Sequence, residues 1–259
     1  MRGVPGEDVR RFRREGFVVL REAFDPAPLA REVAAAFASG FAGTRHNVSA
    51  EAAITFRYLP MMFERTPTSL RLLHDFLTLA ERFVGGDVVP VRAKAVEYHG
   101  ASSWHRDCDL EVASVSFACY LDPLTRASGA LRVVPGSHRT RDVAGDDVPD
   151  AFAVETAPGD AIVFDEHLLH ASPGGGVRYQ WRVDYLARPS GDDGHTIARD
   201  YVAGVYSPDW DGGYDVDAYP TYGPHWRRVC RPADGQLLAE LGAYAAADAA
   251  ESAARRRRG

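Results

Sequence analysis

The feature that most limits the possible folds is a series of short β-rich runs between residues 88 and 186. These runs alternate in polarity or are rich in β-branched and aromatic residues, and Pro and Gly turns separate them at fairly regular intervals. Short strands spaced in this way are typical of a β-sandwich or barrel. The expected strands span residues 88–98, 111–121, 129–134, 151–155, 161–164 and 180–186.

Helices are expected before this β-rich region. Residues 7–15 and 68–83 carry apolar side chains at helical spacing, and Gly16 is placed to end the first of these helices. A further helix is expected after Asp25, because Asp25 is a good N-cap and Pro26 suits the first turn. The helices therefore flank a mainly β core.

The remaining sequence is expected to belong to the same domain, residues 1–259. Helices and core are expected over residues 8–188. Residues 189–232 are rich in Gly, Asp, Tyr and Pro and predict ordered loops that cover the substrate. Residues 233–259 predict an Ala-rich C-terminal helix followed by a solvated tail, in which residues 255–258 are all Arg.

Two short motifs place metal-binding side chains in the β-rich region. His105 and Asp107 are two residues apart, and such residues point to the same face of an extended strand. A further imidazole from residues 165–172 would complete the two histidines and one carboxylate that hold iron in non-heme Fe(II) oxygenases. His167 and His170 both lie there, so two candidates remain for the third ligand.

Composition narrows the possible partners and location. The net charge of −6 gives no indication of nucleic-acid binding. Cys108, Cys119 and Cys230 form no Cys-x-x-Cys pair, which favours a reducing compartment over a disulfide framework or a zinc knuckle. Met1 begins no hydrophobic signal peptide, and the sequence contains no apolar run long enough to span a membrane. A cytoplasmic protein without a membrane partner is expected, and its oligomeric state is open.

Four segments follow one another in an order that is found in a known family. Residues 12–20 look like its opening helix and strand, and residues 128–138 look like its central G-x-L-x-x-x-P-G-S-H segment. Residues 104–107 and 170–172 match its two metal motifs. The chain thus resembles the phytanoyl-CoA dioxygenase-like (PhyH) family of Fe(II)/2-oxoglutarate oxygenases, and the resemblance covers residues 8–188.

This resemblance implies a double-stranded β-helix, or jelly-roll, core with flanking helices. It also implies that His105, Asp107 and His170 bind Fe(II), with 2-oxoglutarate as cosubstrate and O2 as oxidant. The family spacing from Gly159-Asp160 and the His-x-Ser that follows favour His170 over His167.

The resemblance further implies a cation for the distal carboxylate of 2-oxoglutarate. Arg suits this role because its planar guanidinium binds a carboxylate bidentately. Arg182 fits the family position if the loop before it is one residue longer, and Arg178 is the alternative. Ser172 is expected to hydrogen-bond the same carboxylate. Lys94 is expected to face the site as a further cofactor-binding residue, with a surface position as the alternative.

The expected reaction oxidises a C–H bond of a small molecule, by hydroxylation or by oxidative cyclisation. The acidic, nearly lysine-free chain does not indicate a CoA thioester or carrier-protein partner, so a free glycosylated or polyketide-type natural product from a bacterial antibiotic pathway is expected. Aromatic residues of the 189–232 segment either stack on such a substrate or fix the segment to the barrel: Tyr201, Tyr206, Trp210, Tyr214, Tyr219, Tyr222 and Trp226.

Two other functions fit the same fold class. A cupin-like metal isomerase or hydrolase would need no buried Arg on the last core strand and would not consume 2-oxoglutarate. A non-catalytic jelly-roll binding module would be expected to lack part of the metal triad, whereas His105, Asp107 and His170 are all present here.

Overall fold

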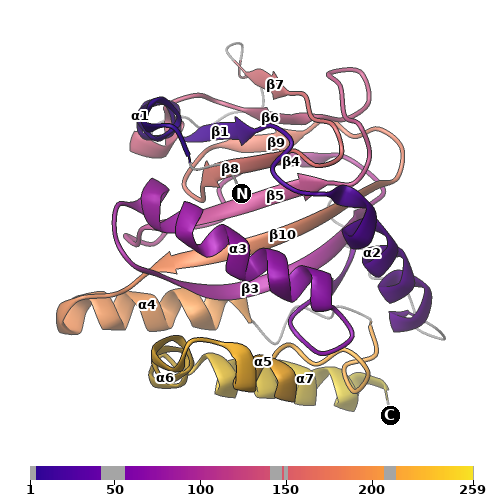
Figure 1. Cartoon of the computed structure of the whole chain (residues 1–259), viewed down its shortest axis with the longest axis vertical. Coiled ribbons are helices and arrows are strands. Elements are labelled where there is room, and N and C mark those ends of the chain that lie inside the picture. The colour runs from indigo at the N-terminus through magenta and orange to yellow at the C-terminus, as the bar shows by residue number, and fades with distance from the viewer. Residues whose placement is uncertain (1–3, 42–55, 141–147, 149–150, 207–213, 259) are drawn as a thin grey trace.

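A six-stranded antiparallel sheet forms the base of the core in this structure, a computed structural model (Figure 1). The structure describes residues 4–41, 56–140, 148, 151–206 and 214–258. The strands of this sheet, in spatial order, are β1 (Phe17–Leu20), β8 (Ala161–Asp165), β5 (Ser114–Tyr120), β10 (Arg178–Ala187), β3 (Val88–Tyr98) and β2 (Phe56–Pro60).

A smaller sheet faces one side of the large sheet. Its strands, in spatial order, are β4 (Ser102–His105), β9 (His170–Ser172), β6 (Leu131–Val133) and β7 (Phe152–Val154), all paired antiparallel. Side chains from both sheets line one cavity, so the two sheets enclose it. The expected mainly β fold with flanking helices and a jelly-roll core is confirmed.

Strand β10 shows why the large sheet lies at the centre of the molecule. Residues alternate between the two faces of a strand. Trp181 and Tyr185 pack toward the helices, and Trp181 lies across from Phe76 of α3 (Pro67–Val84) at a centroid distance of 5.9 Å. Arg178 and Arg182, on the opposite face of the strand, line the cavity between the sheets. One strand therefore contributes both to the core and to the site.

Helix α3 is fastened to the large sheet by a buried hydrogen-bond chain. The indole Nε1 of Trp181 donates to Ser69 Oγ at 2.7 Å, and Ser69 Oγ donates to the Met61 carbonyl at 2.7 Å. All three residues are fully buried. The chain joins α3, β10 and the end of β2, so each polar group is satisfied inside the apolar layer.

The N-terminal helices agree with the expectations. Helix α1 (Gly6–Glu15) ends at Gly16, whose φ of 82° is the left-handed conformation that glycine adopts readily. Helix α2 (Pro26–Gly40) begins after Asp25, whose carboxylate accepts from the Ala27 amide at 3.1 Å. Both helices pack against the sheets in Figure 1.

The interpretation of residues 189–232 as loops is wrong in part, because the segment contains α4 (Gly191–Val205) and α5 (Pro224–Val229). The glycines in α4 favoured a loop, although Ala198, Tyr201 and Val202 are spaced so that they form one buried face of the helix. The described aromatic residues of this segment are buried and pack among themselves or against the sheet: Tyr201, Tyr206, Tyr214, Tyr219, Tyr222 and Trp226. Trp210 lies outside the described residues.

The C-terminal region forms two helices instead of the expected single helix and solvated tail. These are α6 (Pro232–Glu240) and α7 (Ala243–Arg258). Within α7, the exposed Arg255 side chain pairs with Asp217 at 2.8 Å and with Glu251 at 3.5 Å. Both helices lie below the sheet in the orientation of Figure 1.

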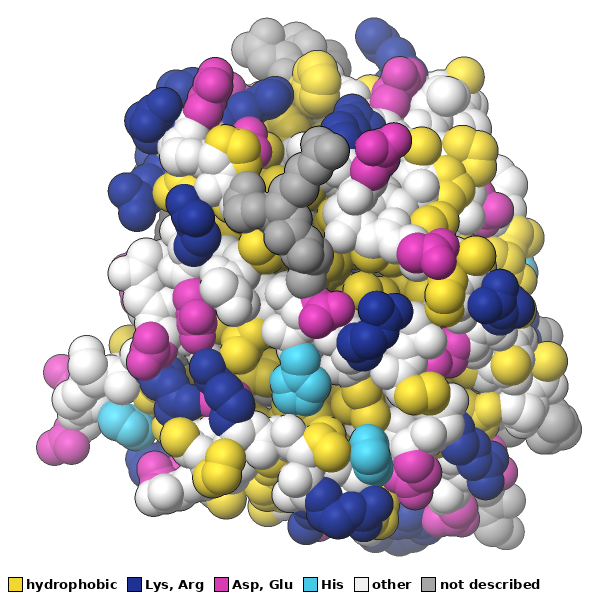
Figure 2. Space-filling view, viewed as in Figure 1, with side chains coloured by type: hydrophobic (Ala, Val, Ile, Leu, Met, Phe, Trp, Pro, Cys, Tyr) yellow, Lys and Arg dark blue, Asp and Glu magenta, His cyan; other side chains and the backbone are white. Residues whose placement is uncertain are grey.

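On the face shown in Figure 2, Lys and Arg side chains are interspersed with Asp and Glu side chains. Within the described part of the chain, no helix is both long enough and apolar enough to cross a membrane.

We expect Ser69→Ala to lower the free energy of unfolding by about 1–3 kcal/mol, because it leaves the buried Trp181 indole N–H and the Met61 carbonyl unpaired. Urea unfolding followed by circular dichroism measures this change. Ser190→Ala is a matched control, since Ser190 is exposed and makes no side-chain cap. Equal free energies of unfolding for the two variants would show that the hydrogen bonds between Trp181, Ser69 and Met61 do not stabilise the position of α3.

Candidate metal centre

The pairing of β4 with β9 brings two histidines together. His105 on β4 lies directly opposite His170 on β9, and the centroids of the two rings are 4.3 Å apart. Asp107 follows β4, where its amide donates to the Glu166 carbonyl at 2.9 Å. One ligand atom from each of His105, Asp107 and His170 lies within 4.8 Å of the other two. The residues expected from the sequence as metal ligands therefore converge.

Backbone carbonyls fix the orientation of both imidazoles. His105 Nδ1 lies 2.8 Å from the Ser103 carbonyl, and His170 Nδ1 lies 2.9 Å from the Leu168 carbonyl. A carbonyl only accepts, so each Nδ1 carries a proton, and in the neutral form of each imidazole the lone pair is then on Nε2. The Nε2 atoms face the Asp107 carboxylate at 3.7 Å and 3.4 Å. Such outer hydrogen bonds are typical of histidines that bind metals.

The ionisation states also suit a metal. Burial, partly opposed by the charge of Asp107, lowers the pKa of His170 to about 4, so this imidazole is neutral near pH 7. Burial alone would raise the pKa of Asp107, but Arg182 and the two histidines hold it well below its usual range. The side chain of Asp107 is 20% exposed, into the cavity. Two imidazoles and one ionised carboxylate fit Fe(II).

His167, the other sequence candidate, lies away from this cluster. Its Nδ1 is 2.8 Å from Asp165, and its Nε2 is 2.7 Å from the Leu110 carbonyl. Hydrogen bonding to Asp165 raises the pKa of His167 to about 10, so both ring nitrogens donate protons. A protonated imidazole offers no lone pair to a metal.

Arg182 sits in a buried network beside the cluster. Its Nη1 donates to Asp107 at 2.9 Å, its Nη2 to Glu166 at 2.9 Å, and its Nε to Asp184 at 2.6 Å. Ser116 Oγ is within 2.8 Å of both Glu166 and Asp184. Three carboxylates therefore share the one guanidinium. Sequence reasoning missed Glu166 and Asp184, although Asp184 shares the inward face of β10 with Arg182.

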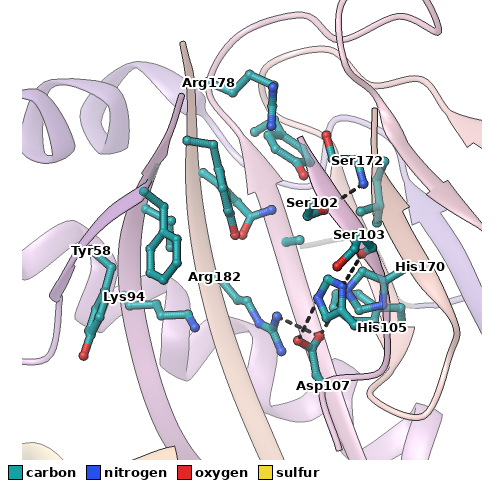
Figure 3. Close-up of a pocket in the computed structure, with 18 residues that line it drawn as sticks. Tyr58, Lys94, Ser102, Ser103, His105, Asp107, His170, Ser172, Arg178 and Arg182 are labelled. Atoms are coloured by element: carbon teal, nitrogen blue, oxygen red, sulfur yellow. Dashed lines mark hydrogen bonds and ion pairs between the residues drawn. The ribbon is translucent and has the colours of Figure 1, made fainter. Parts of the chain in front are cut away.

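A cavity of about 240 Å³ opens in front of the triad (Figure 3). Its walls come from both sheets, and each of the site residues expected from the sequence contributes to them. The lining residues with rings or charges are Phe56, Tyr58, Lys94, Tyr98, His105, Asp107, Tyr120, Phe164, His170, Arg178 and Arg182.

Arg178 occupies the end of this cavity away from Arg182 in Figure 3. The residue is only 2% exposed. Its Nη2 donates to the Gly100 carbonyl at 2.7 Å, and its guanidinium lies 5.7 Å from the centre of the Tyr98 ring. Its buried Nε has no hydrogen-bond partner, and no carboxylate of the described residues forms an ion pair with it. A buried guanidinium without an anion is a ready site for one.

Ser172 and Lys94 also line the cavity. Ser172 Oγ donates to the Gly129 carbonyl at 3.2 Å and lies near the Arg178 end. Lys94 lies opposite Arg182 in the β3–β10 register. Burial and the charges of Arg92 and Arg182 lower the pKa of Lys94 to about 7. Lys94 therefore lines the cavity and does not lie at the surface, which was the alternative position expected from the sequence.

Comparison with known proteins agrees with the geometry. A family model described as Phytanoyl-CoA dioxygenase (PhyH) matches residues 12–175, more than half of the chain. Dioxygenase aneA of Aspergillus aculeatus is 35% identical over 93 residues. That match covers 30% of this chain and 30% of the relative, so the chain spans less than a third of the curated relative.

Solved structures share the fold. AviO1 from Streptomyces viridochromogenes Tue57 superposes with a TM-score of 0.55 at 24% identity, over 71% of this chain and 97% of AviO1. The epimerase SnoN, solved with Fe3+, alpha ketoglutarate and nogalamycin RO, superposes with a TM-score of 0.59 at 16% identity, over 70% of this chain and 82% of SnoN.

We expect His170→Ala to weaken Fe(II) binding at least about a hundredfold, since even outer partners of metal ligands contribute ten- to hundredfold. His167→Ala is the matched control and should bind Fe(II) within about threefold of the unmutated protein, because His167 faces Asp165 and Leu110. Anaerobic calorimetry measures both affinities. The reverse ranking of the two variants would assign the ligand role to His167.

Proposed function

This chain belongs to the phytanoyl-CoA dioxygenase family, and we propose that it is a 2-oxoglutarate-dependent non-heme iron dioxygenase that oxidises a C–H bond of a small molecule of bacterial specialised metabolism. The outcome is hydroxylation or oxidative ring closure. The observation that carries the proposal is the cluster of His105, Asp107 and His170 at one end of a cavity that also contains the unpaired Arg178.

In the proposed site, His105, Asp107 and His170 would hold Fe(II) through two imidazole nitrogens and one carboxylate. Bound iron supplies the activation of O2. In the overall reaction 2-oxoglutarate loses CO2 and becomes succinate. One oxygen atom of O2 enters succinate, and the other leaves in the product hydroxyl, or in water when a ring closes.

We assign the distal carboxylate of 2-oxoglutarate to Arg178, the alternative from the sequence, in preference to Arg182. All three nitrogen positions of Arg182 already donate to carboxylates or to Ser116. Arg178 is as deeply buried but donates only to backbone carbonyls. A dicarboxylate that reaches Arg178 would supply the missing counter-charge. Ser172, near the same end, is proposed to redirect its hydroxyl proton from the Gly129 carbonyl to this carboxylate.

Arg182 then has a different role in the proposal. Its ion pair with Asp107 keeps that carboxylate ionised and fixes its direction. Glu166 and Asp184 hold the guanidinium from the other side. Arg182 is therefore a positioning residue, because it acts on the metal through Asp107.

The proposed substrate is a free molecule of polyketide or oligosaccharide type. SnoN, which shares the fold, is described as an alpha ketoglutarate-dependent epimerase from nogalamycin biosynthesis. The net charge of −6 does not favour a polyanionic CoA thioester or an acidic carrier protein. The buried aromatic residues of residues 189–232 give no support for stacking on a substrate, so the proposal does not depend on them.

We expect Arg178→Ala to weaken 2-oxoglutarate binding at least about a hundredfold, because removing the partner of a buried charge costs about 3–5 kcal/mol. Fe(II) affinity should change little in this variant. Arg182→Ala should show the opposite pattern, with Fe(II) affinity reduced more than 2-oxoglutarate affinity. Anaerobic calorimetry of both ligands separates the two. Loss of 2-oxoglutarate binding in Arg182→Ala alone would return the anchor role to Arg182.

We expect free polyketide or oligosaccharide intermediates to stimulate succinate formation from 2-oxoglutarate. The assay measures succinate and product mass for a panel that also contains acyl-CoA and carrier-bound compounds. Stimulation by the CoA-linked or carrier-linked compounds alone would contradict the proposed substrate class. Absence of any 2-oxoglutarate turnover by iron-loaded protein would contradict the proposed reaction.

A further inference from the structure

We propose that Lys94 binds a carboxylate of the substrate, so that the substrate of this site is a ring-bearing organic acid. The inference rests on the proposed function, because it takes the triad and Arg178 as the sites of iron and 2-oxoglutarate. It adds the chemical class of the third molecule in the cavity, which the fold alone leaves open.

The position of Lys94 separates it from the proposed 2-oxoglutarate anchor. In the β3–β10 register Lys94 pairs with Arg182, whereas Arg178 pairs with Tyr98 at the other end. Four strand residues separate these two levels, which corresponds to about 13 Å. Figure 3 shows Arg178 and Lys94 on different sides of the space in front of the triad. A five-carbon diacid is too short to bind both cations at that separation, so one that reached Arg178 would leave Lys94 available.

Lys94 has no anion of its own within the described residues. Its ammonium forms no hydrogen bond or ion pair there, whereas the neighbouring Arg92 is paired with Asp184 at 2.7 Å. Lys94 also lines a second cavity, of about 330 Å³, that shares Asp107 and Arg182 with the first.

The balance of charge around the triad favours a substrate anion. The dication and the 2-oxoglutarate dianion offset each other, which leaves the protein groups to be counted. Exposed Asp109 and Asp200 lie at the outer rim of the second cavity. The inner groups are three carboxylates and four cations: Asp107, Glu166 and Asp184, with Arg92, Lys94, Arg178 and Arg182. Among these basic groups Arg178 has backbone hydrogen bonds but no ion pair, and within the described residues the Lys94 ammonium has neither.

An aromatic wall beside Lys94 indicates what carries the carboxylate. Tyr58 lies next to Lys94 in Figure 3, and both line the cavity. Tyr58 lies opposite Val96, between the levels of Lys94 and Tyr98. From Tyr58 the aromatic surface continues away from Lys94 toward the Arg178 end, because Phe56 lies 6.4 Å from Tyr58 and 6.5 Å from Tyr98 between ring centroids. Aromatic surfaces of this kind pack against planar or cyclic groups. A ring with an attached carboxylate matches both the wall and the ammonium.

The test uses benzoate and its neutral isostere benzamide as probes. Calorimetry under anaerobic conditions measures their binding to protein loaded with Fe(II) and 2-oxoglutarate. We expect benzoate to bind the unmutated protein at least about tenfold more tightly than benzamide. A hydrogen bond between an ammonium and a carboxylate contributes at least about a factor of ten in affinity. Lys94→Met should abolish the preference, and Lys94→Arg should retain most of it. Equal affinities for the two probes in the unmutated protein would overturn the proposal.

The same variants decide whether Lys94 belongs to 2-oxoglutarate instead. We expect the 2-oxoglutarate affinity of Lys94→Met to stay within about threefold of the unmutated value. A loss comparable to that of Arg178→Ala would assign Lys94 to the cosubstrate and overturn the inference, while the proposed function would stand. Absence of Fe(II) or 2-oxoglutarate binding in the unmutated protein would instead overturn the proposed function.

Chemical modification gives an independent readout, because Lys94 is the single lysine of the chain. The aromatic anion trinitrobenzenesulfonate modifies free amines, and trypsin then releases the modified lysine within residues 93–106, apart from the N-terminal amine. Benzoate should protect Lys94 from modification at least about tenfold more effectively than benzamide. Equal protection by the two probes would count against a carboxylate site.

Discussion

The site depends on one buried guanidinium. Arg182 on β10 bridges Asp107 after β4, Glu166 after β8 and its strand neighbour Asp184, and Tyr201 of α4 donates to Glu166 at 2.8 Å. Breaking such a network leaves uncompensated charge in the interior, so it is held in one arrangement. The direction of the Asp107 carboxylate is thereby fixed before any metal arrives, by elements from both sheets and from the C-terminal region.

Strand β10 makes this arrangement possible because its two faces have different roles. Trp181 and Tyr185 anchor the outer face to α3, and the Trp181 indole is tied to Ser69. The inner face presents Arg178 and Arg182 at two levels of one cavity. The helical layer therefore keeps rigid the strand that sets the spacing between the triad and the cation proposed for 2-oxoglutarate.

The sequence predicts those parts of the fold and the site that follow from local patterns. It does not predict the contacts that depend on tertiary packing. Alternation predicted His105 and Asp107 on one face, and the two side chains do converge, although Asp107 lies just after β4 and is placed by its backbone hydrogen bond to Glu166. The short β-rich runs predicted a sandwich or barrel, and the family resemblance narrowed this to a jelly roll. The choice between Arg178 and Arg182 depended on which guanidinium meets Glu166 and Asp184, and no pattern in the sequence reports that contact. The sequence predicts a loop where α4 lies, because its glycines are a stronger local signal than the helical spacing of three apolar or aromatic residues. Only the folded structure shows that these three residues are buried.

The most direct test of this account is an anaerobic titration of the unmutated protein with Fe(II) in the presence of 2-oxoglutarate, followed by visible charge-transfer absorption. A metal held by His105, Asp107 and His170 keeps open positions, so 2-oxoglutarate can chelate it. The account predicts an absorption band that requires both ligands and saturates at one Fe(II) per chain. Saturable iron binding without any band dependent on 2-oxoglutarate would contradict it.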